Sequence, residues 1–463
     1  MDTIAAIATG NLPTAIGVIR LSGPETDAVL DRVFRARCGR RFSALEPRKL
    51  FLGDILDRAG QTLDGGMAVR FPAGASYTGE DSAELHCHGS PVAMGEILTA
   101  LFAAGARQAR AGEFTQRAFL NGRMDLTQAE AVVDLIDAQT PAAAKNAAGQ
   151  LGGALGRTVC AVYDDLTDIA SRFYAVVDYP DEDIEDIHPA AVEASLRRGV
   201  NALTRLLVTW ERGRILKTGV KTAIVGSPNA GKSSLLNELA GYDRAIVTDV
   251  PGTTRDTVEE SVLCGGVLLR LIDTAGLRDT EDAVEKIGVE RSKHAAQDAQ
   301  LLLAVVDGPS LLRAGFSAGD AAALELAAQH PRWILVVSKS DLLGGHVPIL
   351  ALPEGLPHPP ADVVCLSART GDGLDSLEDA VAALFPAGEA TAGEVLTNPR
   401  HYDAISRGRD ALGRGLDALQ SGLTPDAVLT DMEEAMNALG ELTGRTARED
   451  IVSAIFSRFC VGK

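Results

Sequence analysis

The strongest constraint on the fold is one short segment, which reads Gly226-Ser227-Pro228-Asn229-Ala230-Gly231-Lys232-Ser233. It follows an apolar run at residues 220–225 and precedes a helical pattern. Glycines at both ends let the backbone N–H groups turn toward phosphates, and the start of the following helix adds positive potential. The segment therefore predicts a strand, a phosphate-binding loop and a helix, with Lys232 at the outer phosphates and Ser233 at a magnesium ion.

Apolar runs and amphipathic segments alternate from residue 220 to about residue 385. The apolar runs cover residues 220–225, 267–272, 301–306, 333–337 and 363–366. This alternation is typical of a mostly parallel sheet with helices on both faces. It predicts a multidomain α/β protein in which residues 217–385 form the phosphate-loop domain.

The flanking segments have a different character. Residues 1–121 mix short apolar runs with glycine-bearing turns, which predicts a compact α+β module. Residues 122–216 and 386–463 are helical in pattern, and Thr127-x-x-Glu130 predicts a capping box at the start of the first helix. The simplest interpretation is an α/β domain inserted into a helical domain.

Further segments, in chain order, predict which nucleotide binds. Thr254 offers a hydroxyl to magnesium and the γ-phosphate, Asp273 can hold a water on magnesium, and Gly276 can donate an N–H to the γ-phosphate. Asp341, after a predicted strand, can accept hydrogen bonds from guanine N1–H and the 2-amino group. Adenine has no matching pair of donors, so the acidic residue selects GTP. Ser367-Ala368-Arg369 follows the last strand and can cover the guanine O6.

Two positions depart from the usual GTPase pattern. Ser338 stands where GTPases commonly carry asparagine, which braces the phosphate loop, so we expect reduced guanine affinity and tighter binding after Ser338→Asn. Leu277 follows Gly276 and cannot orient an attacking water as a glutamine does. The spacing leaves several acidic candidates for that role: Asp279, Glu281, Asp282 and Glu285.

Composition limits the setting and the partners. The 463 residues suggest about two to four domains, and no run reaches the ~18–20 apolar residues of a membrane span. Six cysteines without a Cys-x-x-Cys pair favour a reduced, cytoplasmic protein and no membrane partner. The net charge of −19 makes a free-standing RNA-binding protein unexpected. We find no basic module of the kind that ribosome-assembly GTPases add.

Segments outside the nucleotide site carry a family resemblance. They are Asp2 to Thr9 (DTIAAIAT), Tyr77 to Asp81 (YTGED), Gly112 to Asn121 (GEFTQRAFLN) and Ile455 to Lys463 (IFSRFCVGK). With the GTPase segments, they resemble the tRNA-modification GTPase MnmE (TrmE) family over the full chain. The resemblance implies an N-terminal folate-binding and dimerisation domain at residues 1–121, and a helical domain at 122–216 and 386–463 around the GTPase domain.

The resemblance also implies an activity and partners. MnmE proteins are homodimers that act on tRNA with an MnmG-type flavoprotein, as a heterotetramer in which only the partner holds FAD. They modify carbon 5 of the wobble uridine with a one-carbon unit from 5-formyltetrahydrofolate or a related reduced folate. Their GTP hydrolysis needs magnesium and potassium, and a potassium ion beside the phosphates would neutralise charge in the transition state.

The resemblance assigns roles residue by residue. It implies that potassium is bound by Asn229, Thr248, Val250 and Thr253, and magnesium by Ser233 and Thr254. The implied catalytic residues are Glu285, Thr254 and Lys232. The implied folate-binding residues are Arg20, Glu84, Arg123 and Lys463. The expected GTP-binding residues are Asn229, Ala230, Gly231, Lys232, Ser233, Ser234, Thr248, Asp249, Val250, Pro251, Gly252, Thr253, Thr254, Asp273, Thr274, Ala275, Gly276, Ser338, Lys339, Asp341, Ser367, Ala368 and Arg369. A ribosome-assembly GTPase and an adenine-nucleotide enzyme are the alternatives.

Overall fold

The computed structural model describes residues 2–10, 12–178, 188–242, 260–272, 295–344, 352–353, 355–386, 392–446, 449–457 and 459–462. The chain forms two compact units. One contains Met1–Val133, Gln150–Leu203 and Ala404–Lys463, and the other contains Asp134–Gly149 and Thr204–Asp403. The four domain ranges expected from the sequence stay a prediction.

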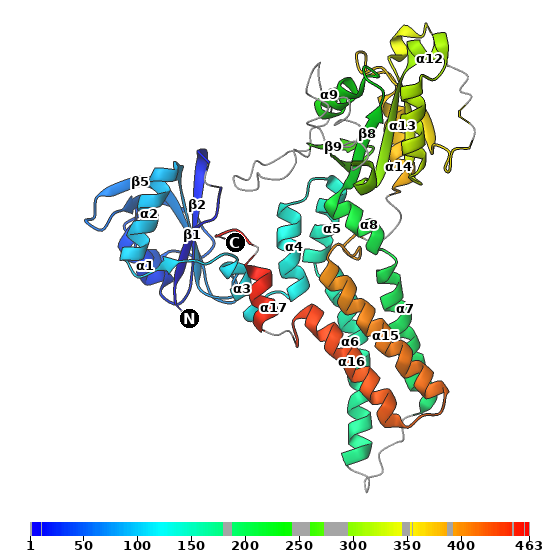
Figure 1. The fold of residues 1–463 in the computed structure, drawn as a ribbon. Helices are drawn as coiled ribbons and strands as arrows, with labels where there is room; N and C mark the ends of the chain where they lie inside the picture. The colour runs from blue at the N-terminus through cyan, green and yellow to red at the C-terminus, as the bar shows by residue number, and fades with distance from the viewer. Residues whose placement is uncertain are drawn as a thin grey trace. The chain divides into compact units, whose positions relative to one another are not determined.

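The N-terminal part of the first unit is a seven-stranded sheet with two helices packed on it (Figure 1). The strand order is β3-β4-β5-β6-β2-β1-β7, and all neighbours are antiparallel except β1 and β7. The elements are β1 (Ile4–Ile7), β2 (Thr14–Ser22), α1 (Thr26–Val33), β3 (Phe34–Ala36), the 3-10 turn η1 (Phe42–Ala44), β4 (Phe51–Leu56), β5 (Thr62–Phe71), β6 (Ser82–Gly89), α2 (Pro91–Ala103), β7 (Arg107–Gln108) and α3 (Glu113–Leu120).

Strand β2 shows why this sheet has one apolar and one polar face. Successive side chains of a strand point to opposite faces. Ile19 and Leu21 are fully buried under helices α1 and α2, and Arg20 between them is only partly buried. The same alternation therefore fills the core and presents Arg20 on the other face.

A buried charge network holds the start of α3. Glu113 accepts hydrogen bonds from Arg107, Arg117 and the backbone N–H of Arg110, and Arg117 also donates to Glu80 at 2.9 Å. Burial alone raises the pKa of Glu113, but the bonds from Arg107, Arg110 and Arg117 outweigh it and lower the pKa to about 2. The carboxylate is thus ionised in the folded protein at neutral pH.

The C-terminal tail returns to the N-terminal sheet. Val461 forms a β-bridge with Ala111, and the Cα of Gly462 lies so close to β1 that a Cβ would approach the carbonyl oxygen of Ile7 at 2.1 Å. Phe456 and Phe459 anchor this tail, with ring centroids 5.4 Å apart. Both ends of the chain therefore contribute to one module.

Eight further described helices lie outside the two sheet-containing parts of the chain and range from 8 to 25 residues in length. Four of them, α6, α7, α15 and α16, lie side by side, because small residues such as Gly199 and Gly408 let them approach closely (Figure 1). The bounds are α4 (Leu126–Ile136), α5 (Pro141–Leu151), α6 (Ala154–Asp178), α7 (Pro189–Leu207), α8 (Trp210–Thr218), α15 (Pro399–Gln420), α16 (Pro425–Thr443) and α17 (Glu449–Phe456). None of the helices in these described segments combines the length and the apolar run that crossing a bilayer requires.

The capping box expected at Thr127 is wrong by two residues. Helix α4 already includes Leu126, and the cap is Asp125, whose carboxylate accepts from the backbone N–H of Gln128 at 2.8 Å. The Gln128 side chain in turn accepts from the backbone N–H of Asp125 at 3.0 Å. Aspartate and glutamine satisfy the same two free backbone donors as the expected threonine and glutamate.

The second unit contains a six-stranded, mostly parallel sheet, as the sequence predicts. The order is β13-β12-β11-β8-β10-β9, and only the β9–β10 pair is antiparallel. Apolar clusters cover both faces of the sheet. The elements are β8 (Val220–Gly226), α9 (Lys232–Tyr242), β9 (Glu260–Cys264), β10 (Val267–Leu271), β11 (Leu301–Asp307), α12 (Gly308–Ala314), α13 (Ala318–Ala328), β12 (Trp333–Ser338), the 3-10 turn η2 (Ser340–Leu342), β13 (Asp362–Cys365) and α14 (Leu374–Leu384).

Candidate nucleotide and folate sites

The phosphate loop joins β8 to α9. Gly226 has φ 157°, and a Cβ there would lie 2.3 Å from the carbonyl oxygen of Val305. Asn229 adopts φ 60° and Gly231 φ 99°, both in the left-handed region that turns the chain sharply. This backbone and the N-terminus of the 11-residue helix α9 form the anion-binding loop that the sequence predicts.

The loop lysine lies across its own loop. The Lys232 ammonium donates to the carbonyl oxygens of Gly226 and Ser227 at 2.8 and 2.7 Å. Burial lowers the pKa of this lysine from its usual value. Its side chain is thereby held at the mouth of the loop, where a phosphate would bring opposite charge.

Ser338 braces the phosphate loop, although the sequence comparison with asparagine suggested that serine is too short. The Ser338 hydroxyl donates to the carbonyl oxygen of Ala230 at 2.6 Å, and both residues are buried. A Cβ on Gly231 would lie 3.2 Å from the Ser338 hydroxyl, so the loop is packed directly against the serine. The structure removes the reason for expecting that Ser338→Asn tightens nucleotide binding.

A second brace comes from the neighbouring lysine. Lys339 has φ 59°, forms an ion pair with Asp307 at 2.5 Å, and donates to the carbonyl oxygen of Asn229 at 3.1 Å. Burial raises the pKa of Asp307, but the bonds from Lys339 and Ser310 outweigh it, so the net shift is downward. Asp307 stays ionised and fixes the position of Lys339 beside the loop.

A third brace was missed by the sequence reasoning. The Ser227 hydroxyl donates to the Asp320 carboxylate at 2.7 Å, and the other oxygen of Asp320 accepts from the backbone and hydroxyl of Ser317. Asp320 is 6% exposed and closes a capping box at the start of α13. The Ser317-x-x-Asp320 spacing would have predicted that cap, but nothing in the sequence links it to the phosphate loop.

Three of the residues predicted to recognise the base, Asp341, Ser367 and Arg369, contact one another. Asp341 accepts from the Ser367 hydroxyl at 2.8 Å through one oxygen and pairs with Arg369 at 2.8 Å through the other. Arg369 is 76% exposed, so its ion pair with Asp341 contributes little and guanine can displace it. The role of Ser367, Ala368 and Arg369 in covering the base stays a prediction.

Strand register explains why residues far apart in sequence form one site. Val305 pairs with Gly226, Asp307 with Ser338, and Val337 with Cys365. The carboxyl ends of these parallel strands therefore share one edge, where open α/β sheets bind ligands. Ser233 and Ser234 lie in the first turn of α9 at this edge and are exposed.

Some predicted residues lie outside the described residues: Thr248, Asp249, Val250, Pro251, Gly252, Thr253, Thr254, Asp273, Thr274, Ala275, Gly276 and Glu285.

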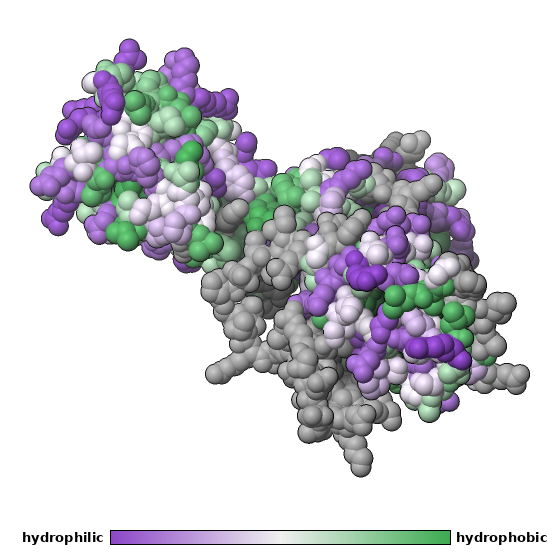
Figure 2. All heavy atoms as spheres, turned by 90° about the horizontal axis from the view of Figure 1, so that it is seen from above, coloured by the Kyte–Doolittle hydropathy of each residue, from purple (hydrophilic) through white to green (hydrophobic). Residues whose placement is uncertain are grey.

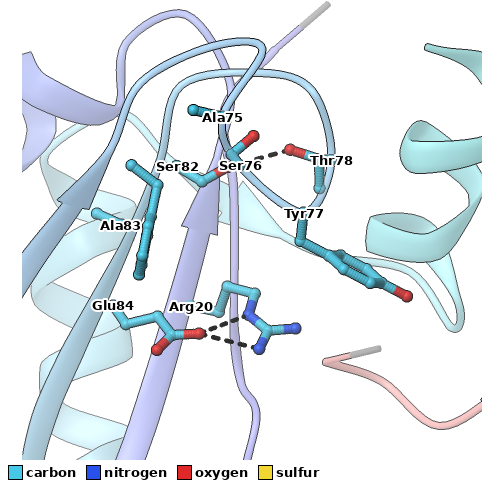
Figure 3. A pocket seen from close by; sticks show the side chains of 9 residues that line it. Arg20, Ala75, Ser76, Tyr77, Thr78, Ser82, Ala83 and Glu84 are labelled. Atoms are coloured by element: carbon cyan, nitrogen blue, oxygen red, sulfur yellow. Dashed lines mark hydrogen bonds and ion pairs between the residues drawn. The ribbon is translucent and has the colours of Figure 1, made fainter. Parts of the chain in front are cut away.

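A separate cavity of about 180 Å³ opens on the polar face of the N-terminal sheet (Figure 3). Arg20 on β2 faces Glu84 on β6 and donates to its carboxylate at 2.9 and 3.1 Å. The Arg20 guanidinium also lies over the Tyr77 ring, 5.6 Å from its centroid, and burial raises the pKa of the Tyr77 hydroxyl. The cavity thus offers a cation, a carboxylate and an aromatic face together.

Of the other two predicted folate residues, the structure describes only Arg123, which lies beside this cavity. Arg123 is exposed and donates to the carbonyl oxygen of Gly74 at 3.2 Å, on the loop whose residues 75–78 line the cavity. Lys463 lies outside the described residues, but its neighbour Gly462 lies against β1, the strand that pairs with β2. Tyr77 lay within a recognised segment, and sequence alone did not mark it as a site residue.

The fold and the braced loop are those of a phosphate-loop GTPase, and Asp341 lies where the sequence predicts the carboxylate that recognises guanine. The sequence also matches two family profiles, the MnmE helical domain over residues 126–460 and the GTP-binding protein TrmE N-terminus over residues 3–123. The chain belongs to the MnmE family of tRNA modification GTPases.

Relatives of similar length support this assignment. The tRNA modification GTPase MnmE of Synechococcus sp. (strain JA-2-3B'a(2-13)) is 44% identical, over 100% of this chain and 98% of the relative. Those of Roseiflexus castenholzii and Akkermansia muciniphila are each 42% identical, over 100% of this chain and 99% of each relative. The G domain of the T. maritima FeoB iron transporter is 27% identical over 35% of this chain and 97% of that structure, with a TM-score of 0.25. The family assignment does not rest on that structure.

Proposed function

We propose that this chain is a potassium-dependent GTPase which, with a flavoprotein partner, modifies carbon 5 of the tRNA wobble uridine using a one-carbon unit from a reduced folate. The observation that carries the proposal is the similarity to tRNA modification GTPases over the whole chain, together with the braced guanine-nucleotide site. A ribosome-assembly GTPase would share the nucleotide site but not the N-terminal cavity.

The described residues of the phosphate loop suit magnesium and potassium. Ser233 is exposed at the start of α9, where its hydroxyl can join magnesium beside the phosphates. Asn229 is exposed on the turn of the loop, where its side-chain oxygen can help to hold potassium. The two cations would neutralise the charge that grows on the phosphate oxygens in the transition state.

The N-terminal cavity suits a reduced folate, which would supply the one-carbon unit. The Glu84 carboxylate can accept hydrogen bonds from the donor edge of a pterin, and the Tyr77 ring offers a flat apolar face. Arg20 holds Glu84 in place, and Arg123 at the rim can pair with the carboxylate tail of folate. In this proposal these residues bind and orient the folate.

The folate claim is tested by thermal unfolding of the full chain with 5-formyltetrahydrofolate. At a hundredfold excess over Kd, a bound ligand stabilises the protein by about 2.7 kcal/mol, which raises the Tm of its unit by several degrees. We expect this rise for the wild type, a smaller one for Arg20→Lys, and none for Arg20→Ala. A wild-type Tm that stays constant contradicts the folate assignment.

The overall proposal is tested in cells that lack their own MnmE protein. Nucleosides from total tRNA are separated by mass spectrometry after expression of the wild type or of Lys232→Ala. We expect the wild type, and not the variant, to restore the uridine modified at carbon 5. Unmodified uridine with a wild-type chain that still hydrolyses GTP would favour the ribosome-assembly alternative.

A further inference from the structure

An exposed group of arginines stands out in this acidic chain. The ten residues 32–41 contain five arginines and no acidic residue, in a chain whose net charge is −19. We call Arg32, Arg35, Arg37, Arg40 and Arg41 the basic edge; all five are exposed. The acidic net charge of the chain is therefore compatible with a local cluster of exposed arginines.

The fold presents these arginines on ordered backbone at the margin of a sheet. Strand β3 is the outermost strand at one end of the sheet, and its residues Phe34 and Ala36 are buried while Arg35 is exposed. After the turn, Phe42 is fully buried and meets Phe34 edge to face, with centroids 6.4 Å apart. Two apolar anchors thus hold the strand and the turn that carry Arg37, Arg40 and Arg41.

Nearby carboxylates compensate little of this charge. Asp31 is held by the backbone N–H and hydroxyl of Ser43 at 2.9 and 2.8 Å. Asp54 reaches Arg37 only at 3.8 Å, and that arginine side chain is 63% exposed. Within the described parts of the chain, Arg35, Arg40 and Arg41 form no ion pair. Arginines elsewhere differ, since Arg172, Arg197 and Arg214 each pair with a carboxylate on their own helix.

A purely structural role explains only part of the basic edge. Charged side chains on an outermost strand block pairing with another chain. That role accounts for Arg35, and a lysine or a glutamate would serve it equally well. It does not account for Arg40 and Arg41, which follow the strand in the turn and at the start of η1.

We propose that the basic edge binds the phosphate backbone of RNA, and that it is a tRNA-docking surface of the N-terminal module. The proposal rests on the proposed function, in which tRNA is the substrate. Uncompensated, exposed guanidinium groups are the chemistry that recognises phosphates, and they release counterions when they bind. The face of the N-terminal module seen at the left of Figure 2 mixes hydrophilic and hydrophobic side chains and offers no single broad apolar surface.

The test measures binding of the full-length protein to a tRNA transcript by fluorescence anisotropy at several potassium chloride concentrations. The test variant is Arg35→Gln/Arg40→Gln/Arg41→Gln. The control, Arg172→Gln/Arg197→Gln/Arg214→Gln, makes the same change in net charge at paired arginines that are exposed or, for Arg214, partly exposed. A third variant replaces the three edge arginines by lysine. GTP hydrolysis and the Tm of each variant verify that it folds.

Each lost phosphate contact lowers affinity by roughly fivefold near 0.15 M salt and reduces the slope of log K against log salt concentration by about one. We therefore expect at least a tenfold loss and a slope reduced by two to three for the glutamine variant. The control and the lysine variant should stay within about threefold of the wild type.

Three results would overturn the docking surface: equal affinities and slopes for test and control variants, no binding of wild type at low salt, or equal competition by phosphatidylglycerol vesicles at matched phosphate concentration. The first and third results leave the proposed function untouched, and if the wild type does not bind tRNA, nucleoside analysis of tRNA tests that function separately. If the glutamine variant keeps its modification activity and its tRNA affinity, the docking surface is rejected and the proposed function is retained.

Discussion

The hydroxyl of Ser338, the last residue of β12, donates a hydrogen bond to the phosphate loop, so its removal should loosen the nucleotide site. Ser338→Ala deletes the 2.6 Å hydrogen bond to Ala230 and leaves a carbonyl oxygen of a buried residue without that donor. Alanine keeps the packing against Gly231, because only the hydroxyl oxygen is lost. The substitution therefore isolates the hydrogen bond.

The expected magnitude follows from the contribution of one such bond. A hydrogen bond between neutral groups contributes about 0.5–1.5 kcal/mol net, and 1.4 kcal/mol corresponds to a tenfold change in Kd. If nucleotide binding must restore the loop geometry, Ser338→Ala should weaken GDP binding by roughly two- to tenfold. Because the serine already makes the bracing hydrogen bond to Ala230, we expect that Ser338→Asn does not bind GDP more tightly.

Titration of a fluorescent GDP analogue measures these affinities directly. The control is Thr218→Ala, which removes an exposed hydroxyl-to-carbonyl bond of 2.8 Å in the same unit, away from the loop. The control should bind like the wild type. A Ser338→Ala variant with wild-type affinity, or a Ser338→Asn variant that binds tenfold tighter, would show that serine is not an effective brace.

Three further predictions concern other parts of the chain. Ser227→Ala and Asp320→Asn should each weaken GDP and ATP binding by the same factor of a few, measured by competition titration, because their bond positions the loop and not the base. A change confined to guanine nucleotides would contradict this. Since the pKa of Glu113 is lowered from 4.5 to about 2, its contribution to the free energy of unfolding is present above pH ~4.5 and is lost as the pH falls toward 2. Urea unfolding at decreasing pH should show the free energy of unfolding fall by up to about 3 kcal/mol because of this group. Glu113→Gln should make the free energy of unfolding depend less on pH. An equally steep pH dependence in the variant would refute the assignment. Burial raises the pKa of the Cys264 thiol to about 12, so iodoacetamide at pH 8 should label exposed Cys38 and leave Cys264 unlabelled in the native protein; labelling of both at similar rates would contradict the structure.

The sequence predicts most of the local elements of the α/β domain, because most of its strands, such as β11 and β12, are apolar runs. The run at 301–306 became β11 and the run at 333–337 became β12. Strand β9 was missed because Glu260 and Ser261 interrupt its apolar pattern, although it pairs with β10. The cap at Asp125 was missed because Thr127 offers an equally good signal two residues later.

The tertiary contacts of the site were less predictable. Sequence marked Ser338, but only the packed loop shows that a serine reaches Ala230. Sequence could not connect Asp320 with Ser227, because the two residues are joined by the fold and not by a motif. Arg20 and Glu84 came from the family resemblance, and the register of β2 and β6 places them opposite each other. The roles of Thr254 and Glu285 remain predictions.

The most direct test of the proposed GTPase mechanism is phosphate release from GTP by the full-length chain in potassium chloride and in sodium chloride at equal ionic strength. The account predicts much faster hydrolysis in potassium, a loss of that difference in Asn229→Ala, and slow hydrolysis in both salts for Glu285→Ala. Equal wild-type rates in the two salts would contradict the potassium role. An unaffected Glu285→Ala would remove that residue from the mechanism.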